Sequence, residues 1–177
     1  MTKSGKMLAF FAATALFAAI AGPALAADPI KIGVAGAHSG DLASYGLPTL
    51  KGAQLVVKDV NAKGGINGRK IELLVRDDGQ DKEKARQAAQ ELIALHPDII
   101  IGPVTSSMAA VVMPLFNQAG QIIISPTVAS TDFYGKDDNL FRVNCTTREA
   151  AIQHARVLYA RGIITAPNVV LAGIVGS

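Results

Sequence analysis

The segment of this chain best suited to bind a small anion is 102–107, Gly-Pro-Val-Thr-Ser-Ser. It follows an apolar run and precedes a stretch with helical spacing, so it places the free N–H groups of a helix start beside two or three hydroxyls. The helix dipole contributes about 0.3–1 kcal/mol for an anion there, and each charge-assisted hydrogen bond about 1.5–3 kcal/mol. These groups predict a carboxylate or phosphate site at Ser106 and Ser107. The alternative, that one of the two serines only caps the helix, stays open.

A second loop rich in hydroxyl groups, 125–131, leaves the next apolar run. If both runs are parallel strands, the two loops lie at the same edge of the sheet and face each other. The second loop would then hold the other side of a small polar ligand. Taken alone, it has the composition of an ordinary turn.

Residues that support catalysis or metal binding are present, but their spacing fits no known site. Asp77 and Asp78 suggest a metal or a phospho-acceptor, yet Asp81 is explained as a helix N-cap, and no calcium loop with its distal Glu follows. We therefore predict no enzyme, no metal and no cofactor, with an enzyme built on the aspartates as the alternative. The residues that miss the spacing of metal ligands, catalytic triads or dinucleotide loops are His38, His96, His154, Gly33, Gly36 and Gly40.

The elements that must position these loops are apolar runs alternating with amphipathic stretches from Ile30 onward. Segments such as 98–101 and 122–124 do not alternate apolar with polar residues, which is typical of parallel strands covered by helices on both faces. We predict the α/β class, with a doubly wound parallel sheet flanked by helices. The expected strands are 30–37, 70–76, 98–101, 121–125, 140–144 and 168–174. The expected helices are 47–62, 81–95, 107–119 and 148–161, with caps at Asp81 and at Thr146-Thr147.

Two single residues carry expectations of their own. Pro114 removes a backbone hydrogen bond inside the third expected helix, so we expect a kink or an early end there. Cys145 lies beside apolar Val143 in a strand-like run, which favours a buried, inert thiol over a free reactive one. Because it is the only cysteine, the chain has no internal disulfide.

The first 26 residues have the composition of a secretory signal peptide. Lys3 and Lys6 precede the apolar run 7–21, and Ala24-Leu25-Ala26 places small residues where a signal peptidase acts. We expect cleavage after Ala26 and release into the periplasm. A stable membrane insertion is not expected, because a span needs roughly 20 apolar residues.

The charge of the chain argues against nucleic acid as a partner. Lys3 and Lys6 account for two of the three net positive charges, so the remainder carries about +1. No stripe of Lys and Arg with interleaved aromatic residues is present in the sequence. The expected partner is therefore a small molecule.

Several short motifs occur in a fixed order along the chain. They are 30–34, Ser39-Gly40, Tyr45-Gly46, Gly52-Ala53, 61–73 (Asn-Ala-Lys-Gly-Gly-Ile-Asn-Gly-Arg-Lys-Ile-Glu-Leu), Asp77-Asp78, 101–103, Ser106-Ser107, Ser125-Pro126 and 140–143. This ordered set resembles the N-terminal lobe of the periplasmic binding proteins for branched-chain amino acids, the soluble receptors of ABC importers. The resemblance covers nearly all of residues 30–143.

The resemblance implies roles for individual residues. Ser106 matches the serine that binds the ligand's α-carboxylate, and the main-chain carbonyl of Thr127 matches the acceptor for its α-ammonium group. Tyr45 matches an aromatic residue lining the cleft. Ala129 stands where many amino-acid binders have a threonine, so one hydroxyl contact is missing and the ligand is left open beyond leucine, isoleucine and valine.

The resemblance also implies a domain organisation. Family members have two lobes that close on the ligand like a hinged trap. We expect a signal peptide at 1–26, an N-terminal ligand-binding lobe at 27–146 and the start of a truncated, incomplete second lobe at 147–177. The implied partners are a small amino-acid-like ligand and, with a second lobe, the ABC permease subunits. The alternative is a ligand-sensing or regulatory module of the same fold, such as an amide or amino-acid sensor.

Overall fold

Of the 177 residues of the chain, the computed structural model describes 28–165. The expected signal peptide with its cleavage after Ala26 and the expected strand 168–174 lie outside the described residues. No helix between residues 28 and 165 is both long enough and apolar enough to cross a membrane.

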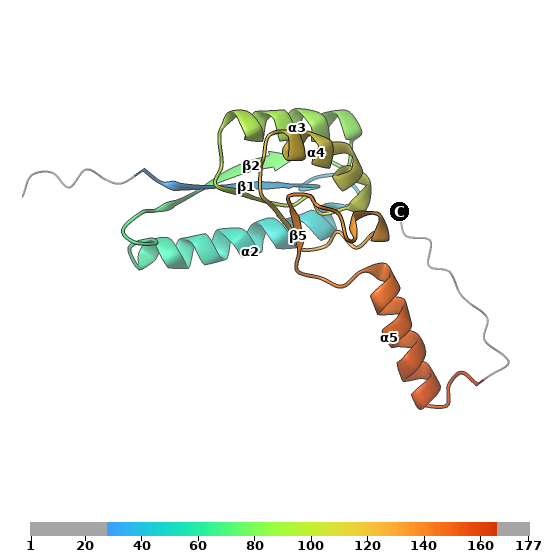
Figure 1. The fold of residues 1–177 in the computed structure, drawn as a ribbon. Coiled ribbons are helices and arrows are strands. Elements are labelled where there is room, and N and C mark those ends of the chain that lie inside the picture. The colour runs from blue at the N-terminus through green and yellow to red at the C-terminus, as the bar shows by residue number, and fades with distance from the viewer. Residues whose placement is uncertain (1–27, 166–177) are drawn as a thin grey trace, which may run out of the picture.

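The described residues form one parallel sheet of five strands (Figure 1). The strands are β1 (Ile30–Gly36), β2 (Ile71–Asp77), β3 (Ile99–Ile101), β4 (Ile123–Ser125) and β5 (Leu140–Arg142), in the order β2-β1-β3-β4-β5. All neighbouring pairs are parallel, which confirms the predicted doubly wound sheet. This strand order switches direction between β1 and β3, and open α/β sheets bind ligands at such a switch point.

Helices cover the sheet from both sides (Figure 1). Helix α2 (Ala43–Ala62) lies on one face, and α3 (Lys82–Ala94) and α4 (Ser106–Gln118) lie together on the other. The fully buried side chains between the sheet and the α3–α4 layer include Leu92, Phe116, Ile100 and Ile123. A short 3-10 helix, η1 (Thr131–Phe133), precedes β5, and α5 (Thr147–Ala160) follows it.

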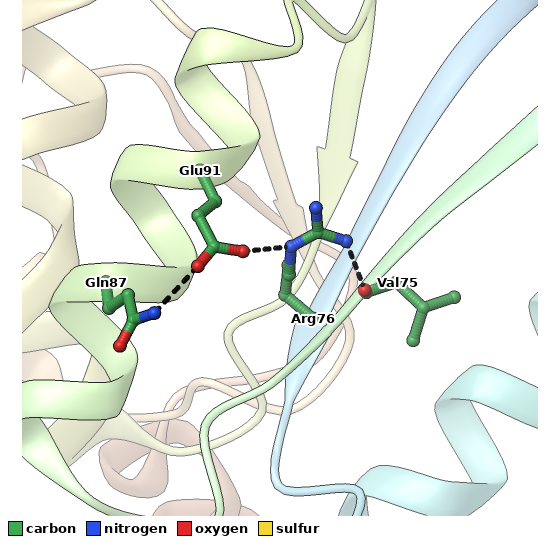
Figure 2. Close-up of polar contacts among 4 residues, drawn as sticks. All are labelled: Val75, Arg76, Gln87 and Glu91. Atoms are coloured by element: carbon green, nitrogen blue, oxygen red, sulfur yellow. Dashed lines mark hydrogen bonds and ion pairs between the residues drawn. The ribbon is translucent and has the colours of Figure 1, made fainter.

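A polar network fixes α3 to the end of β2 (Figure 2). Arg76 Nε lies 2.5 Å from Glu91 Oε2, and its Nη1 donates to the Val75 carbonyl at 2.8 Å. Gln87 donates to the other oxygen of Glu91 at 2.8 Å. The hydrogen bonds from Gln87 and Arg76 lower the pKa of Glu91, so this carboxylate keeps its charge and its partners at neutral pH.

The helices differ from the predictions by more than one residue, or in the role of a proline, at two places. Helix α2 begins at Ala43 instead of Leu47. Helix α4 contains Pro114 and continues to Gln118, so the early end expected at Pro114 is wrong. Pro114 and Ala110 are both exposed, so the proline lies on a side of α4 that does not face the core.

The predicted burial of Cys145 is also wrong, because its side chain is exposed. The expected strand 140–144 ends at Arg142, so Cys145 lies in the connection to α5 and not in the sheet. Thr146, next to it, is the N-cap of α5 and forms a capping box with Glu149, as the Thr146-Thr147 pair predicted.

Candidate functional site

The N-terminus of α4 opens into a cleft at the carboxyl end of the sheet. Thr105 is the N-cap, because its backbone is extended and its side chain accepts a hydrogen bond from the Met108 N–H at 3.4 Å. The interpretation in which Ser106 or Ser107 caps the helix is therefore wrong. Both serines lie in the first turn, where backbone N–H groups have no intrahelical acceptor.

Ser106 joins the two hydroxyl-rich loops that the sequence indicated. Its Oγ accepts hydrogen bonds from the N–H groups of Ala129 at 3.3 Å and Ser130 at 3.2 Å. A hydroxyl has two acceptor lone pairs and one proton. With both lone pairs occupied, the Ser106 hydroxyl is left to act as a donor, which suits it to an anionic oxygen.

Ser107 points toward a different loop. Its Oγ accepts from Gln80 Nε2 at 2.9 Å, and Thr105 Oγ1 donates to Gln80 Oε1 at 3.1 Å. Gln80 has a left-handed backbone, with φ of 63°, and lies in the turn after β2. No contact between Gln80 and Ser107 was predicted from the sequence, because only the fold brings the loop after β2 against the start of α4.

Thr127 and the buried Ser125 hold the loop after β4 against the loop after β3. Thr127 Oγ1 donates to the Val104 carbonyl at 2.5 Å. Ser125 Oγ donates to the Pro103 carbonyl at 2.7 Å and accepts from the Val128 N–H at 3.1 Å. Both hydroxyls are thus used inside the protein, and no donor among the described residues reaches the Thr127 carbonyl.

The cleft has a volume of about 1110 Å³, and all five residues expected at the site line it. Tyr45, from the start of α2, is 60% exposed and forms a side wall. Ala110 and Met113 of α4 provide an apolar floor. The remaining expected residues of the lining are Ser106, Ser107, Thr127 and Ala129.

The aspartates at the end of β2 order the neighbouring loops. Asp77 Oδ1 accepts from the N–H groups of His38 at 2.7 Å and Gly79 at 2.9 Å. Burial alone would raise the pKa of Asp77, but hydrogen bonds from the Ser39 hydroxyl and from these backbone N–H groups outweigh it and lower the pKa. Asp78 is buried, and desolvation raises its pKa. Within residues 28–165 no group of three or more His, Cys, Asp or Glu side chains is placed to hold a metal ion.

His38 lies beside these aspartates, and desolvation lowers its pKa although the charges of Asp77 and Asp78 oppose that shift. Neither of its ring nitrogens has a hydrogen-bond partner among the described residues. A neutral ring is the form that tolerates such a position best.

Comparison with known proteins identifies this fold. The family model described as "Periplasmic binding protein" matches residues 29–165. The chain belongs to the periplasmic binding protein family. The chain is 33% identical over 106 residues to the Leu/Ile/Val-binding protein of Escherichia coli. This alignment covers 60% of this chain and 29% of that protein. It is 29% identical over 169 residues to the Leu/Ile/Val-binding protein BraC3 of Rhizobium johnstonii, covering 85% of this chain and 46% of that one.

Solved structures of periplasmic binding proteins share the fold. The branched-chain amino acid binding protein LivJ of Streptococcus pneumoniae, in complex with isoleucine, matches with a TM-score of 0.63 and 34% identity, over 67% of this chain and 34% of that one. A fatty acid ABC transporter substrate-binding protein of Thermomonospora curvata matches with a TM-score of 0.69 and 26% identity, over 81% and 36%. This periplasmic binding protein chain spans less than half the length of these relatives.

Proposed function

We propose that this chain supplies the N-terminal half of the extracytoplasmic solute-binding site of an ABC importer for amino acids or related small carboxylates and amides. It would act in the periplasm by binding its ligand, without chemical conversion. The observation that carries the proposal is the Ser106 hydroxyl, which accepts two backbone hydrogen bonds and so presents its proton to the cleft.

The geometry supports a definite orientation of the ligand. The carboxylate would lie against the Ser106 hydroxyl and the first-turn N–H groups of α4, where the positive end of the helix dipole stabilises an anion. An α-ammonium group would lie against the Thr127 carbonyl, and the rest of the ligand between Tyr45 and the apolar floor at Met113. Isoleucine and fatty acids, the ligands named for two relatives, share the carboxylate that this arrangement would hold.

The ligand class extends beyond the branched-chain amino acids because Ala129 provides no hydroxyl. Ser130, the next residue, uses its Oγ as an acceptor for the Asp132 N–H at 3.2 Å. It therefore does not replace the missing group in the cleft. Ligands with a carboxylate and fewer additional polar groups fit this site better than the amino acids that a threonine would contact twice.

Isothermal titration calorimetry with matched ligand pairs tests the proposal. Each pair keeps the apolar part and replaces the carboxylate by an alcohol: isoleucine with isoleucinol, and octanoate with octanol. We expect at least one carboxylate to bind and its alcohol to bind more weakly or not at all. Equal binding within every pair would contradict the proposed head-group site.

The same titrations on a chimera test the site with a second lobe present. In the chimera, the C-terminal remainder of the Rhizobium johnstonii relative follows residue 165. Carboxylate binding by the chimera would support the assignment of the Ser106 cleft. A folded chimera that binds no carboxylate would overturn it.

A further inference from the structure

Gln80 has a backbone conformation that its residue type does not favour. Its φ is 63°, in the left-handed region that suits glycine and, less often, asparagine. The other two non-glycine residues with positive φ within 28–165 lie in ordinary places: Asn67 is an asparagine in a turn, and His96 follows the C-cap of α3. A strained residue persists where its surroundings hold it, and such residues cluster at functional sites.

The backbone of Gln80 is held by a buried carboxylate. Its N–H donates to Asp78 Oδ1 at 2.8 Å, and Asp78 is only 3% exposed. The Asp78 N–H donates in turn to the Gly36 carbonyl at the end of β1, at 3.0 Å. The next residue, Asp81, is the N-cap of α3. The Gln80 backbone is thus tied to the sheet on one side and to α3 on the other, so its side chain leaves from a fixed point.

The Gln80 side chain contacts the start of α4 at two hydroxyls. Its Oε1 accepts from Thr105 Oγ1 at 3.1 Å, and its Nε2 donates to Ser107 Oγ at 2.9 Å. Thr105 Oγ1 also accepts from the Met108 N–H as the N-cap of the helix. One amide therefore binds the residues on both sides of Ser106, which lines the cleft.

These hydrogen bonds assign the protons of the two hydroxyls, each of which has one proton and two acceptor lone pairs. Thr105 gives its proton to Gln80, so in the 3.3 Å contact between Thr105 Oγ1 and Ser107 Oγ only Ser107 can donate. Ser107 accepts from Gln80, so its own proton stays available. An anion in the cleft is a stronger acceptor for that proton than the neutral Thr105 hydroxyl, because charge-assisted hydrogen bonds are about twice as strong as neutral ones.

We infer that Gln80 is a positioning residue, which sets Ser107 as the second hydroxyl donor to a ligand carboxylate. The inference rests on the proposed function, in which Ser106 is the first donor. A carboxylate has two oxygens, and Ser106 and Ser107 are adjacent residues that both line the cleft. Gln80 is not part of the cleft lining and acts through Ser107. The hydrogen bond that it donates also polarises the Ser107 hydroxyl, which makes this hydroxyl a better donor.

Gln80→Glu reverses this assignment and keeps the length and shape of the side chain. Both oxygens of an ionised glutamate are acceptors only, so Thr105 and Ser107 would each donate their proton to it. The Ser107 hydroxyl would then have no proton left for the cleft. Gln80→Met removes the amide without adding a charge, so it leaves the Ser107 hydroxyl undirected and should have a smaller effect.

The test is isothermal titration calorimetry of the purified chain with the matched pairs isoleucine and isoleucinol, and octanoate and octanol. For a pair whose carboxylate the parent chain prefers, Gln80→Glu should reduce the ratio of carboxylate to alcohol affinity at least about tenfold, and Gln80→Met about threefold. A substitution that only loosened the fold would weaken both members of a pair alike. Gln90→Glu is the matched control and should keep the parent ratio, because Gln90 is exposed on α3 and lies outside the cleft lining.

The same titrations in a Ser107→Ala background separate an effect through Ser107 from simple repulsion between the introduced carboxylate and the ligand. With no Ser107 hydroxyl to redirect, Gln80→Glu should change the ratio less than about threefold, because the two substitutions act on one hydrogen bond and their effects do not add. An equal loss with and without the Ser107 hydroxyl would overturn the inference, and so would a folded Gln80→Glu variant with the parent ratio. A parent chain that prefers neither member of any pair would overturn the proposed function and this inference together.

Discussion

At the scale of single residues, Ser106 has two functions in the same side chain. Its Oγ accepts hydrogen bonds from the N–H groups of Ala129 and Ser130 in the loop after β4, and its hydroxyl proton can be donated to a ligand in the cleft. Ser106→Ala should weaken binding of a carboxylate ligand by about 10- to 150-fold, the equivalent of one charge-assisted hydrogen bond of roughly 1.5–3 kcal/mol. Calorimetry with the best ligand measures this.

Ser44→Ala is the matched control for that substitution, because Ser44 lies in α2 outside the cleft lining. It should bind the ligand like the parent chain. Identical affinities for the Ser106→Ala and Ser44→Ala variants would show that the Ser106 hydroxyl does not touch the ligand.

The neighbouring Asp77 and Asp78 should respond to pH with opposite signs. The folded pKa of Asp77 is lowered, so its ionised form stabilises the fold above the ordinary carboxyl pKa, and this contribution is lost as the pH falls through the lowered pKa. The folded pKa of Asp78 is raised, so its contribution is present at low pH and is lost as the pH rises through the raised value.

Asp77→Asn should therefore lower the free energy of unfolding at pH 7 by about 1 kcal/mol, a value discounted for the exposure of this carboxylate. The difference from the parent chain should shrink toward pH 3. Asp78→Asn should cost less at pH 7, because it removes a buried charge. Urea unfolding at both pH values measures the two variants, and equal losses at pH 7 would contradict the assignment.

At the scale of elements, helix α2 contains two glycines with opposite surroundings. A Cβ at Gly46 would overlap the Ala37 carbonyl oxygen, whereas a Cβ at Gly52 would meet no atom within 4 Å. Gly52→Ala should stabilise the protein by about 0.5–1 kcal/mol through helix propensity alone. Gly46→Ala should destabilise it by at least about 1–3 kcal/mol, because the backbone must move.

Thermal unfolding followed by circular dichroism compares the two glycine variants directly. The two glycine variants also bear on the ligand site. Tyr45, which precedes Gly46 in the chain, forms a wall of the cleft, and the close approach of Gly46 to Ala37 sets its position. A stabilising Gly46→Ala substitution would show that α2 does not pack against the end of β1 as described.

The sequence predicted which strands and helices form more accurately than it predicted the residues where they begin and end. Continuous apolar runs identified the parallel sheet, and hydroxyl-rich loops after two strands identified the cleft, since both follow from burial and chain direction. Three consecutive hydroxyl residues at the start of α4 left the cap ambiguous, and only the extended backbone of Thr105 decides it. The individual contacts of Gln80 with Ser107 and of Ser125 with Pro103 were not predicted, because they join residues more than 20 positions apart.

At the scale of the whole molecule, coverage of the sheet is uneven. One face carries two helices over its length, while the other carries α2 and an exposed apolar half.

The hydrogen bond from the Thr147 N–H to the Ala129 carbonyl links the start of α5 to the loop at the rim of the cleft. Cys145 lies two residues before Thr147, is exposed, and is the single thiol of the chain. An environment-sensitive dye attached to that sulfur would register a displacement of this loop as a change in emission. A dye on Cys145 would therefore report whether a ligand occupies the cleft, and no cysteine would have to be introduced for it.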